Sequence, residues 1–173
     1  GKMANPVRER ETMIMDTIFT HHPLFETEVL NPRTSLKGNT RSGKITIEGG
    51  DFQVVRKDVF LIGTGIRTST QGIDFILEHI RENSEESCHV IVQELPSSPE
   101  SFIHLDMIFT LLDRDICLVY EPMVFGMSRY RTIYIRIENQ KVVRITEMPN
   151  IPEALRLLKI DVKSLSCGGK EDL

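Results

Sequence analysis

The sequence has 173 residues, of which 40% are hydrophobic and 27% are charged, and its formal net charge is −4. This length predicts a single domain, and this hydrophobic content is enough to form a buried core. The slight negative charge and the lack of tryptophan disfavour a nucleic-acid partner. Because no apolar run is long enough to cross a bilayer and no signal peptide is evident, we expect no membrane partner either.

The first half of the chain predicts a helix, a loop and a series of short strands. Asn5 and Pro6 are typical of a helix start, and the following helix should span 7–21, where Met13, Ile14, Thr17 and Ile18 follow helical spacing. A long polar loop is expected over 26–43. The elements predicted after it are strands at 45–48, 52–56 and 59–62, a helix at 69–82 and a strand at 89–95.

The second half continues with two hairpins, one helix and one strand. The predicted strands are 107–112, 116–120, 133–137, 142–146 and 161–165, and the helix is 152–158. Two β-β-α-β units can be drawn from this order, at 52–95 and 133–165. The fold class we predict is therefore α/β (α+β), built from similar modules in one domain over residues 1–173.

The first candidate site follows the predicted strand at 45–48. Glu48-Gly49-Gly50-Asp51 places two carboxylates around two glycines, which permit positive φ and a close approach of the backbone to a ligand. A plain hairpin turn with solvated acids is the competing interpretation, and the local sequence leaves both open.

The second candidate is the segment around His104 and Asp106. On an extended strand, residues two apart share a face, so the histidine would have a carboxylate beside it and could act as an acid–base. A satisfied, partly buried histidine is the competing interpretation. A divalent metal bound by Glu48, Asp51, His104 and Asp106 is a further alternative, although these residues lack the usual zinc spacing.

The remaining candidates are arginines and cysteines. Arg8 near the first helix and Arg67 after a strand could each bind a carboxylate through a bidentate fork, or lie solvated on the surface. Cys88, Cys117 and Cys167 are widely spaced and odd in number, which predicts neither a disulfide framework nor a cysteine metal site and favours a reducing cytoplasm.

Taken together, these motifs resemble the arginine deiminases of the guanidine-modifying superfamily. The matching segments are Arg8-Glu9-Arg10-Glu11-Thr12, Ile18-Phe19-Thr20-His21-His22-Pro23, Glu48-Gly49-Gly50-Asp51, Arg67-Thr68, His104-Leu105-Asp106 with Phe109-Thr110, and Cys167-Gly168-Gly169. The resemblance covers nearly the whole chain. It implies a partial five-bladed α/β propeller of the amidinotransferase type, and conversion of L-arginine and water to L-citrulline and ammonia without a metal or organic cofactor.

The resemblance also implies a role for each candidate residue. His104, Glu48 and Asp106 would be catalytic: His104 moves protons, Glu48 holds it, and Asp106 binds the substrate guanidinium. Arg8 and Arg67 would bind the substrate carboxylate. Asp51, with Gly49 and Gly50, would shape the turn.

The chain departs from the family pattern in three places. A cysteine that forms a covalent thiouronium would follow a glycine-rich loop, and Cys167 aligns with a non-catalytic turn instead. A second guanidinium-binding aspartate before Arg8 is also absent, and Met107 stands where the family has threonine. We therefore expect an inactive central part of a longer catalytic domain, whose exposed module edges could form a homo-oligomer. The alternatives are a non-enzymatic arginine-binding module and another guanidine-modifying enzyme, an agmatine deiminase or an amidinotransferase.

Overall fold

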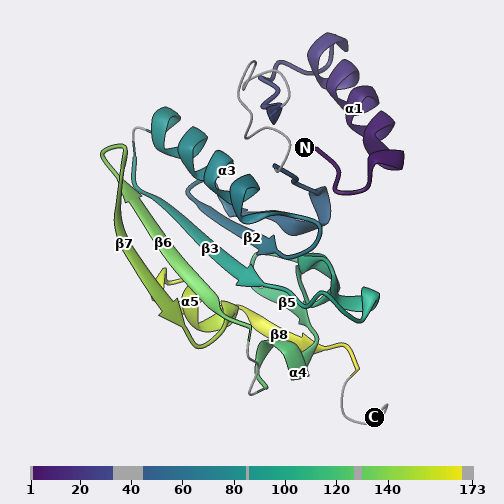
Figure 1. Cartoon of the computed structure of the whole chain (residues 1–173). Coiled ribbons are helices and arrows are strands. Elements are labelled where there is room, and N and C mark those ends of the chain that lie inside the picture. The colour runs from purple at the N-terminus through teal and green to yellow at the C-terminus, as the bar shows by residue number, and fades with distance from the viewer. Residues whose placement is uncertain (1, 33–44, 85, 127–129, 169–173) are drawn as a thin grey trace.

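The computed structural model describes residues 2–32, 45–84, 86–126 and 130–168 (Figure 1). The loop predicted over 26–43 therefore lies partly outside the described residues. Within these ranges, no helix combines the length and the apolar character that a membrane crossing requires.

The larger of two mixed sheets has five strands in the order β1-β2-β3-β6-β7. These are β1 (Phe52–Arg56), β2 (Val59–Thr64), β3 (Cys88–Glu94), β6 (Thr132–Glu138) and β7 (Lys141–Met148). Strands β2 and β3 are parallel, and the other neighbours are antiparallel. The carboxyl ends of β2 and β3 therefore meet at one edge of the sheet, and the loops that leave them lie close together.

The smaller sheet has three strands in the order β4-β5-β8. These are β4 (Phe109–Leu111), β5 (Ile116–Val119) and β8 (Lys163–Ser166). Strands β4 and β5 are antiparallel, whereas β5 and β8 are parallel. The two sheets are joined at their edges by the side chain of Gln53 in β1, which donates to the Phe109 carbonyl at 2.7 Å and accepts from the Leu111 N–H at 3.4 Å.

Among the described residues, four α-helices and four short 3-10 turns accompany these sheets. The helices are α1 (Glu9–His21), α3 (Thr70–Asn83), α4 (Glu121–Val124) and α5 (Ile151–Leu157). The 3-10 turns are Pro6–Arg8, Gly49–Asp51, Glu100–Phe102 and Leu105–Met107. Helix α4 was not predicted, because it is a single turn that contains Pro122 and carries no periodic signal.

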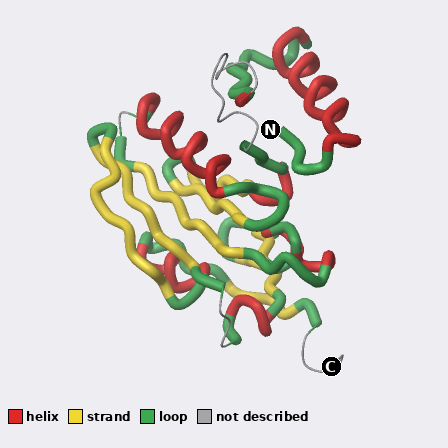
Figure 2. Tube along the Cα trace, in the orientation of Figure 1, coloured by secondary structure: helices red, strands yellow, loops and turns green. Residues whose placement is uncertain are grey.

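The core lies on both faces of the larger sheet (Figure 2). Helix α3 covers one face, where Ile73, Ile76 and Ile80 pack against Val90 and Val92. This helix begins as predicted, because the Ser69 hydroxyl accepts a hydrogen bond from the Gly72 N–H at 3.1 Å. The opposite face packs against α5 and the smaller sheet and contains the fully buried residues Leu61, Ile91, Leu105, Phe109 and Leu155.

The β-β-α-β unit predicted at 52–95 is confirmed as β1-β2-α3-β3, but the one predicted at 133–165 is wrong. Strands β6 and β7 extend the first sheet, whereas β8 pairs with β5. The second unit is therefore β4-β5-α5-β8, with the β6-β7 hairpin inserted into it. Both units share one plan, in which an antiparallel hairpin is followed by a helix and a strand parallel to the second strand of the hairpin.

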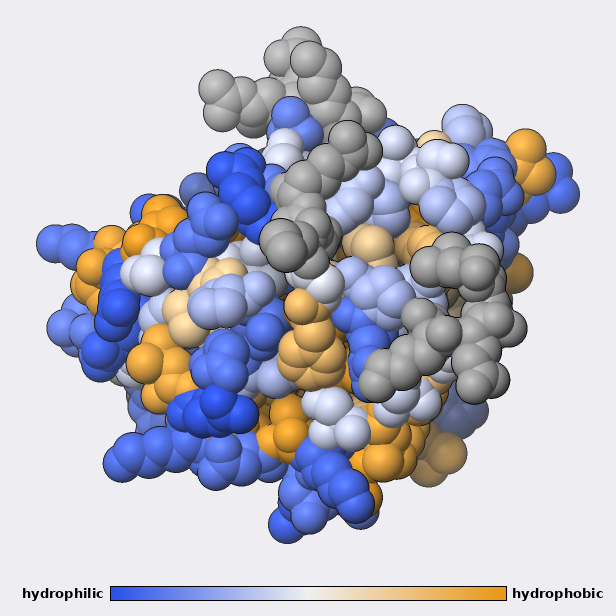
Figure 3. All heavy atoms as spheres, turned by 90° about the horizontal axis from the view of Figure 1, so that it is seen from below, coloured by the Kyte–Doolittle hydropathy of each residue, from blue (hydrophilic) through white to orange (hydrophobic). Residues whose placement is uncertain are grey.

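Helix α1 lies at one end of the molecule, beside the N-terminus (Figure 1). The apolar face predicted for it is not buried: Met13, Ile14 and Ile18 are exposed, and within α1 Thr12 is the buried residue. Helical periodicity predicted the helix itself but not which of its faces is buried. Elsewhere, seen from below, the surface mixes hydrophilic residues with separate apolar patches (Figure 3).

Candidate active site

Glu48 is the centre of the candidate site and is 2% exposed. The segment 45–48 was predicted as a strand, but it pairs with no strand among the described residues. Its backbone groups bind other partners: the Thr46 N–H donates to the Ser69 hydroxyl and the Glu48 N–H donates to the Thr68 hydroxyl, both at 3.1 Å. The loop that caps α3 therefore holds this segment in place of a sheet.

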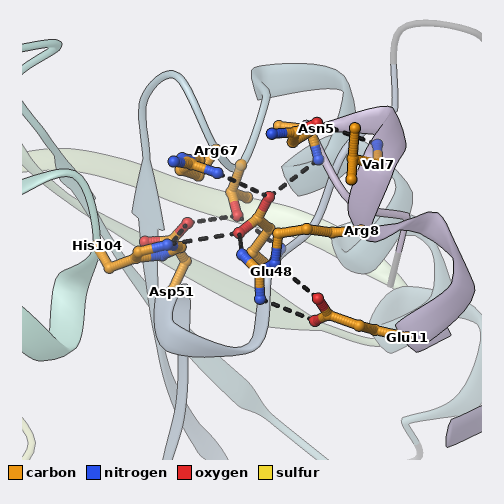
Figure 4. Close-up of polar contacts among 10 residues, drawn as sticks. Asn5, Val7, Arg8, Glu11, Glu48, Asp51, Arg67 and His104 are labelled. Atoms are coloured by element: carbon orange, nitrogen blue, oxygen red, sulfur yellow. Dashed lines mark hydrogen bonds and ion pairs between the residues drawn. The ribbon is translucent and has the colours of Figure 1, made fainter. Parts of the chain in front are cut away.

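Three cationic or titratable side chains converge on the Glu48 carboxylate (Figure 4). Arg8 Nη1 lies 3.1 Å and His104 Nε2 3.4 Å from Oε2, while Arg67 Nη1 lies 3.7 Å from Oε1. These residues come from the start of α1, the loop after β2 and the turn before β4. Because a buried carboxylate needs compensating charge, this convergence offsets the desolvation of Glu48.

The two arginines differ in how they are engaged. Arg8 also binds Glu11 through Nε and Nη2, both at 2.9 Å, and these hydrogen bonds lower the pKa of the Glu11 carboxyl. Arg67 makes one ion pair within the described residues, the long contact to Glu48. Arg67 therefore keeps more donors available to a ligand than Arg8 does.

Asp51 is 1% exposed and ties the turn at 49–51 to two other loops. Its Oδ2 accepts from the Thr68 hydroxyl at 2.6 Å, and its Oδ1 accepts from the Leu105 N–H at 3.0 Å. Oδ2 also lies 3.4 Å from His104 Nδ1. Burial raises the pKa of Asp51, while the Thr68 and Leu105 hydrogen bonds and the nearby His104 oppose that rise.

The glycines of the turn act differently from the prediction. Positive φ was expected, but Gly168 is the glycine with positive φ among the described residues. Gly50 is required by crowding instead: a Cβ there would lie 2.9 Å from Asp106 Oδ2 and 3.1 Å from His104 Nδ1. A Cβ on Gly49 would meet nothing within 4 Å.

His104 and Asp106 were expected on an extended strand, and that expectation is wrong. The backbone turns after His104 into the 3-10 turn Leu105–Met107, in which the Met107 N–H donates to the His104 carbonyl at 3.2 Å. Leu105 is fully buried, and its anchoring in the core favours the turn over a strand. The turn still directs His104 and Asp106 to the same place, against Gly50.

Other candidates are not brought to this cluster. Within the part of the chain that the structure describes, no group of three or more His, Cys, Asp or Glu side chains is arranged to hold a metal ion. Cys88 begins β3, at the end of that strand away from the site loops, and Cys117 is buried in β5. Burial raises the pKa of the Cys117 thiol, which makes it a poor nucleophile.

The fold and the site define an α/β protein in which the turns before two β-β-α-β units bring an ion-paired carboxylate and a histidine together. The arginine deiminase family model matches residues 1–170, so the chain belongs to the arginine deiminase family, and the resemblance seen in the sequence is confirmed.

Several curated relatives show the same similarity. Arginine deiminases of Bacillus cereus (strain ATCC 10987 / NRS 248) and Bacillus thuringiensis subsp. konkukian (strain 97-27) are each 30% identical, over 98% of this chain and 40% of the relative. That of Listeria monocytogenes serotype 4a (strain HCC23) is 26% identical, over 99% of this chain and 40% of the relative. The chain thus spans about two fifths of the length of these relatives.

Two residues of the cluster were missed by the sequence reasoning. Thr68 was noted only as part of a motif, yet its hydroxyl joins Glu48 to Asp51. Glu11 was likewise not considered, although it binds Arg8. The adjacent hydroxyls of Thr68 and Ser69 after a buried strand were a weak signal, because their partners lie about 20 residues earlier in the chain.

Proposed function

We propose that this chain supplies the proton-transfer and guanidinium-binding part of an arginine deiminase site, which converts L-arginine and water to L-citrulline and ammonia. The observation that carries the proposal is the convergence of Arg8, Arg67 and His104 on buried Glu48, in a chain of this family. Asp106 supports it further: its side chain is exposed beside Gly50, and its carboxylate makes no ion pair within the described residues. A substrate guanidinium could donate charged hydrogen bonds to this carboxylate.

The proposed reaction has two covalent steps. A cysteine thiolate forms a bond to the guanidinium carbon, the carbon–nitrogen bond breaks, and His104 protonates the departing ammonia. Water then attacks the same carbon, His104 accepts its proton, and the carbon–sulfur bond breaks to release citrulline. Asp106 binds the guanidinium, Glu48 orients His104, and the substrate carboxylate binds Arg67 together with Arg8. No cofactor is required.

The thiolate in this proposal comes from outside residues 1–173. Cys88 and Cys117 are buried. The resemblance seen in the sequence implies that Cys167 aligns with a non-catalytic turn of the family. We therefore propose that the 173-residue chain alone produces negligible citrulline, since a missing covalent nucleophile removes most of the rate enhancement. The 40% share of the relatives supports placing residues 1–173 in one domain, as the central part of a longer catalytic domain.

The repeated unit supports a larger architecture. We propose that β1-β2-α3-β3 and β4-β5-α5-β8 are two blades of a five-bladed α/β propeller, whose site lies where the turns before the blades meet. The exposed edge strand β7 could pair with a second copy in a homo-oligomer. The three free thiols favour a cytoplasmic location.

Isothermal titration calorimetry on the 173-residue chain tests the binding part of the proposal. We expect saturable heat with L-arginine and much weaker heat with agmatine, which lacks the carboxylate that Arg67 would bind. Asp106→Asn should abolish the signal, and Asp113→Asn, in the turn between β4 and β5, is the matched control. A preference for agmatine would indicate another guanidine-modifying enzyme, and no heat with either ligand at millimolar concentration would contradict the assigned roles.

A citrulline assay tests the chemical part. We expect no turnover by the 173-residue chain and turnover by a longer polypeptide that contains it together with a suitable cysteine. In the active polypeptide, His104→Asn should lower kcat by about 100-fold or more, the usual contribution of a proton-transferring group. Binding without turnover in both forms would favour an arginine-binding module, and turnover by the 173-residue chain would refute the external thiolate.

A further inference from the structure

Thr68 is a buried polar residue to which the proposed reaction assigns no role. It is 0% exposed and lies between Arg67 and the α3 cap Ser69. Its hydroxyl accepts from the Glu48 N–H at 3.1 Å and donates to Asp51 Oδ2 at 2.6 Å. One hydroxyl therefore joins the backbone of the central carboxylate residue to the side chain of the turn that follows it.

The direction of these hydrogen bonds is fixed by chemistry. A backbone N–H can only donate, so the Thr68 oxygen must accept from Glu48. The hydroxyl proton is then directed toward Asp51 Oδ2, which must accept it. Asp51 Oδ1 also faces an obligatory donor, the Leu105 N–H at 3.0 Å. Both oxygens of Asp51 are thus held as acceptors, which favours the ionised carboxylate despite its burial.

The acceptor role of Asp51 also affects His104. Its buried Nδ1 lies 3.4 Å from Asp51 Oδ2 and makes no hydrogen bond within the described residues. Because Oδ2 is held as an acceptor, the arrangement favours a proton on Nδ1. Nε2 faces Glu48 Oε2 at the same distance of 3.4 Å, but the Glu48 carboxylate already has Arg8 and Arg67 as cationic partners, so Nε2 is the nitrogen left to exchange protons. Contacts of this length commonly shorten when a substrate binds.

We propose that Thr68 is a positioning residue which, through Asp51, fixes His104 in the tautomer with the proton on Nδ1. Thr68 touches neither the substrate position nor the reacting nitrogen, so it acts only through Asp51. This inference rests on the proposed function for its catalytic consequence, since a fixed tautomer matters only if Nε2 transfers protons. The tautomer itself can be measured without turnover.

Two opposed influences act on the pKa of Asp51, and the Thr68 hydroxyl belongs to one of them. Burial raises it, and the hydrogen bond from Thr68 is the largest of the influences that lower it. Loss of the hydroxyl should therefore raise the pKa of Asp51 further and favour its protonated form. A protonated Asp51 would no longer require His104 to donate from Nδ1.

The substitution Thr68→Val tests the proposal, because valine keeps the shape of threonine and removes only the hydroxyl. The readout is the pair of His104 ring nitrogen shifts in ¹⁵N-labelled 173-residue chain, measured at mildly alkaline pH and assigned by comparison with His104→Asn. We expect the proton mainly on Nδ1 in the parent. In Thr68→Val at least half of the population should carry it on Nε2.

Two further variants separate positioning from packing. Thr68→Ser keeps the hydroxyl and should retain the parent tautomer. Thr70→Val makes the same change at an exposed residue whose hydroxyl binds only Gln71 within the described residues. This variant should also retain the parent tautomer. If Thr68→Val does not fold, Thr68→Ala removes the hydroxyl without a misplaced methyl group. An unchanged tautomer in a folded variant without the hydroxyl would overturn the proposal, as would the proton on Nε2 in the parent.

The outcome is independent of the proposed reaction. A parent with the expected tautomer but no arginine binding would refute the proposed function and leave the Thr68 connection intact. In an active longer polypeptide, Thr68→Val should lower kcat by about tenfold with little change in KM, and Thr68→Ser should restore it.

Discussion

The 3-10 turns that precede β1 and β4 have similar backbones but are anchored in different ways. Glu48 (φ −110°, ψ 145°) leads into Gly49–Asp51, and His104 (φ −124°, ψ 150°) leads into Leu105–Met107. Glu48 and His104 hold equivalent positions in their two units and contact each other. The first turn is fixed by polar contacts around Asp51, whereas the second is fixed by the burial of Leu105.

This difference in anchoring indicates that the two turns have different structural roles in the site. Gly50 of the first turn leaves room for the His104 and Asp106 side chains, so the first turn packs closely beneath them. The apolar anchor of the second turn keeps His104 and Asp106 on a rigid support. A site between two modules thus combines one small, polar surface with one turn attached to the core.

The largest effect should follow removal of the apolar anchor. Leu105→Ala would leave a cavity in the core and should lower the free energy of unfolding by about 2–5 kcal/mol, as measured by urea denaturation. Leu112→Ala, at an exposed position, is the control and should change it by less than about 0.5 kcal/mol. Equal losses in the two variants would mean that Leu105 does not anchor its turn.

The first turn should respond differently, in ligand binding more than in stability. Gly50→Ala places a Cβ against the Asp106 carboxylate and should weaken L-arginine binding by about tenfold, roughly 1.4 kcal/mol. Gly49→Ala has open space and should bind like the parent. Calorimetry on both variants checks this pair, and equal affinities would show that close packing at Gly50 is unimportant.

The connection between the two units can be tested at Gln53. Gln53→Leu removes the amide that binds the Phe109 carbonyl and the Leu111 N–H. Leaving those backbone groups without their partner should cost about 1–2 kcal/mol of unfolding free energy. Gln71→Leu, at an exposed position in the first turn of α3, serves as the control. A stability like that of the parent would mean that water replaces the amide at this edge.

The smallest effect concerns the pH dependence of stability. Burial raises the pKa of Asp51 above its ordinary 3.8. Between pH 3.8 and the pKa of the folded state, the folded chain therefore retains a proton that the unfolded chain has lost. The resulting stabilisation is complete below about pH 3.8 and is lost as the pH rises through the folded-state pKa. Asp51→Asn cannot titrate, so its urea midpoint should fall less than that of the parent over this window. Parallel curves would exclude Asp51 as the cause.

The sequence predicted the regular elements well, because periodicity and capping are local. The bounds of β1, β2, β3, β6 and β7 and of the helices α3 and α5 were predicted to within two residues. The partner of β8 could not be predicted, because its short pattern is equally compatible with either sheet. The strand expected at 45–48 failed because hydroxyl groups, rather than a neighbouring strand, bind its backbone.

The candidate site was predicted in its members but not in its connections. Glu48, Asp51, Arg8, Arg67 and His104 are brought together, and their catalytic roles stay predictions. The turn at 105–107 was missed because polar and apolar residues alternate around His104, and this alternation is typical of a strand. The burial of Leu105, which favours the turn, is not evident from the sequence. Thr68 was missed because a threonine in a loop gives no sign of a partner so distant in the sequence.

The inserted β6-β7 hairpin also affects the order in which the chain can fold. Strands β2 and β3 pair across residues 59–94, whereas β5 must wait for β8 across residues 116–166. Because closing a longer loop costs more chain entropy, we expect the first unit to form before the second. Pulse-labelled hydrogen exchange should then show protected β2 and β3 amides before protected β5 and β8 amides, and the reverse order would contradict this. His104 precedes β4 and belongs to the unit that forms later, so the two halves of the site would meet only near the end of folding.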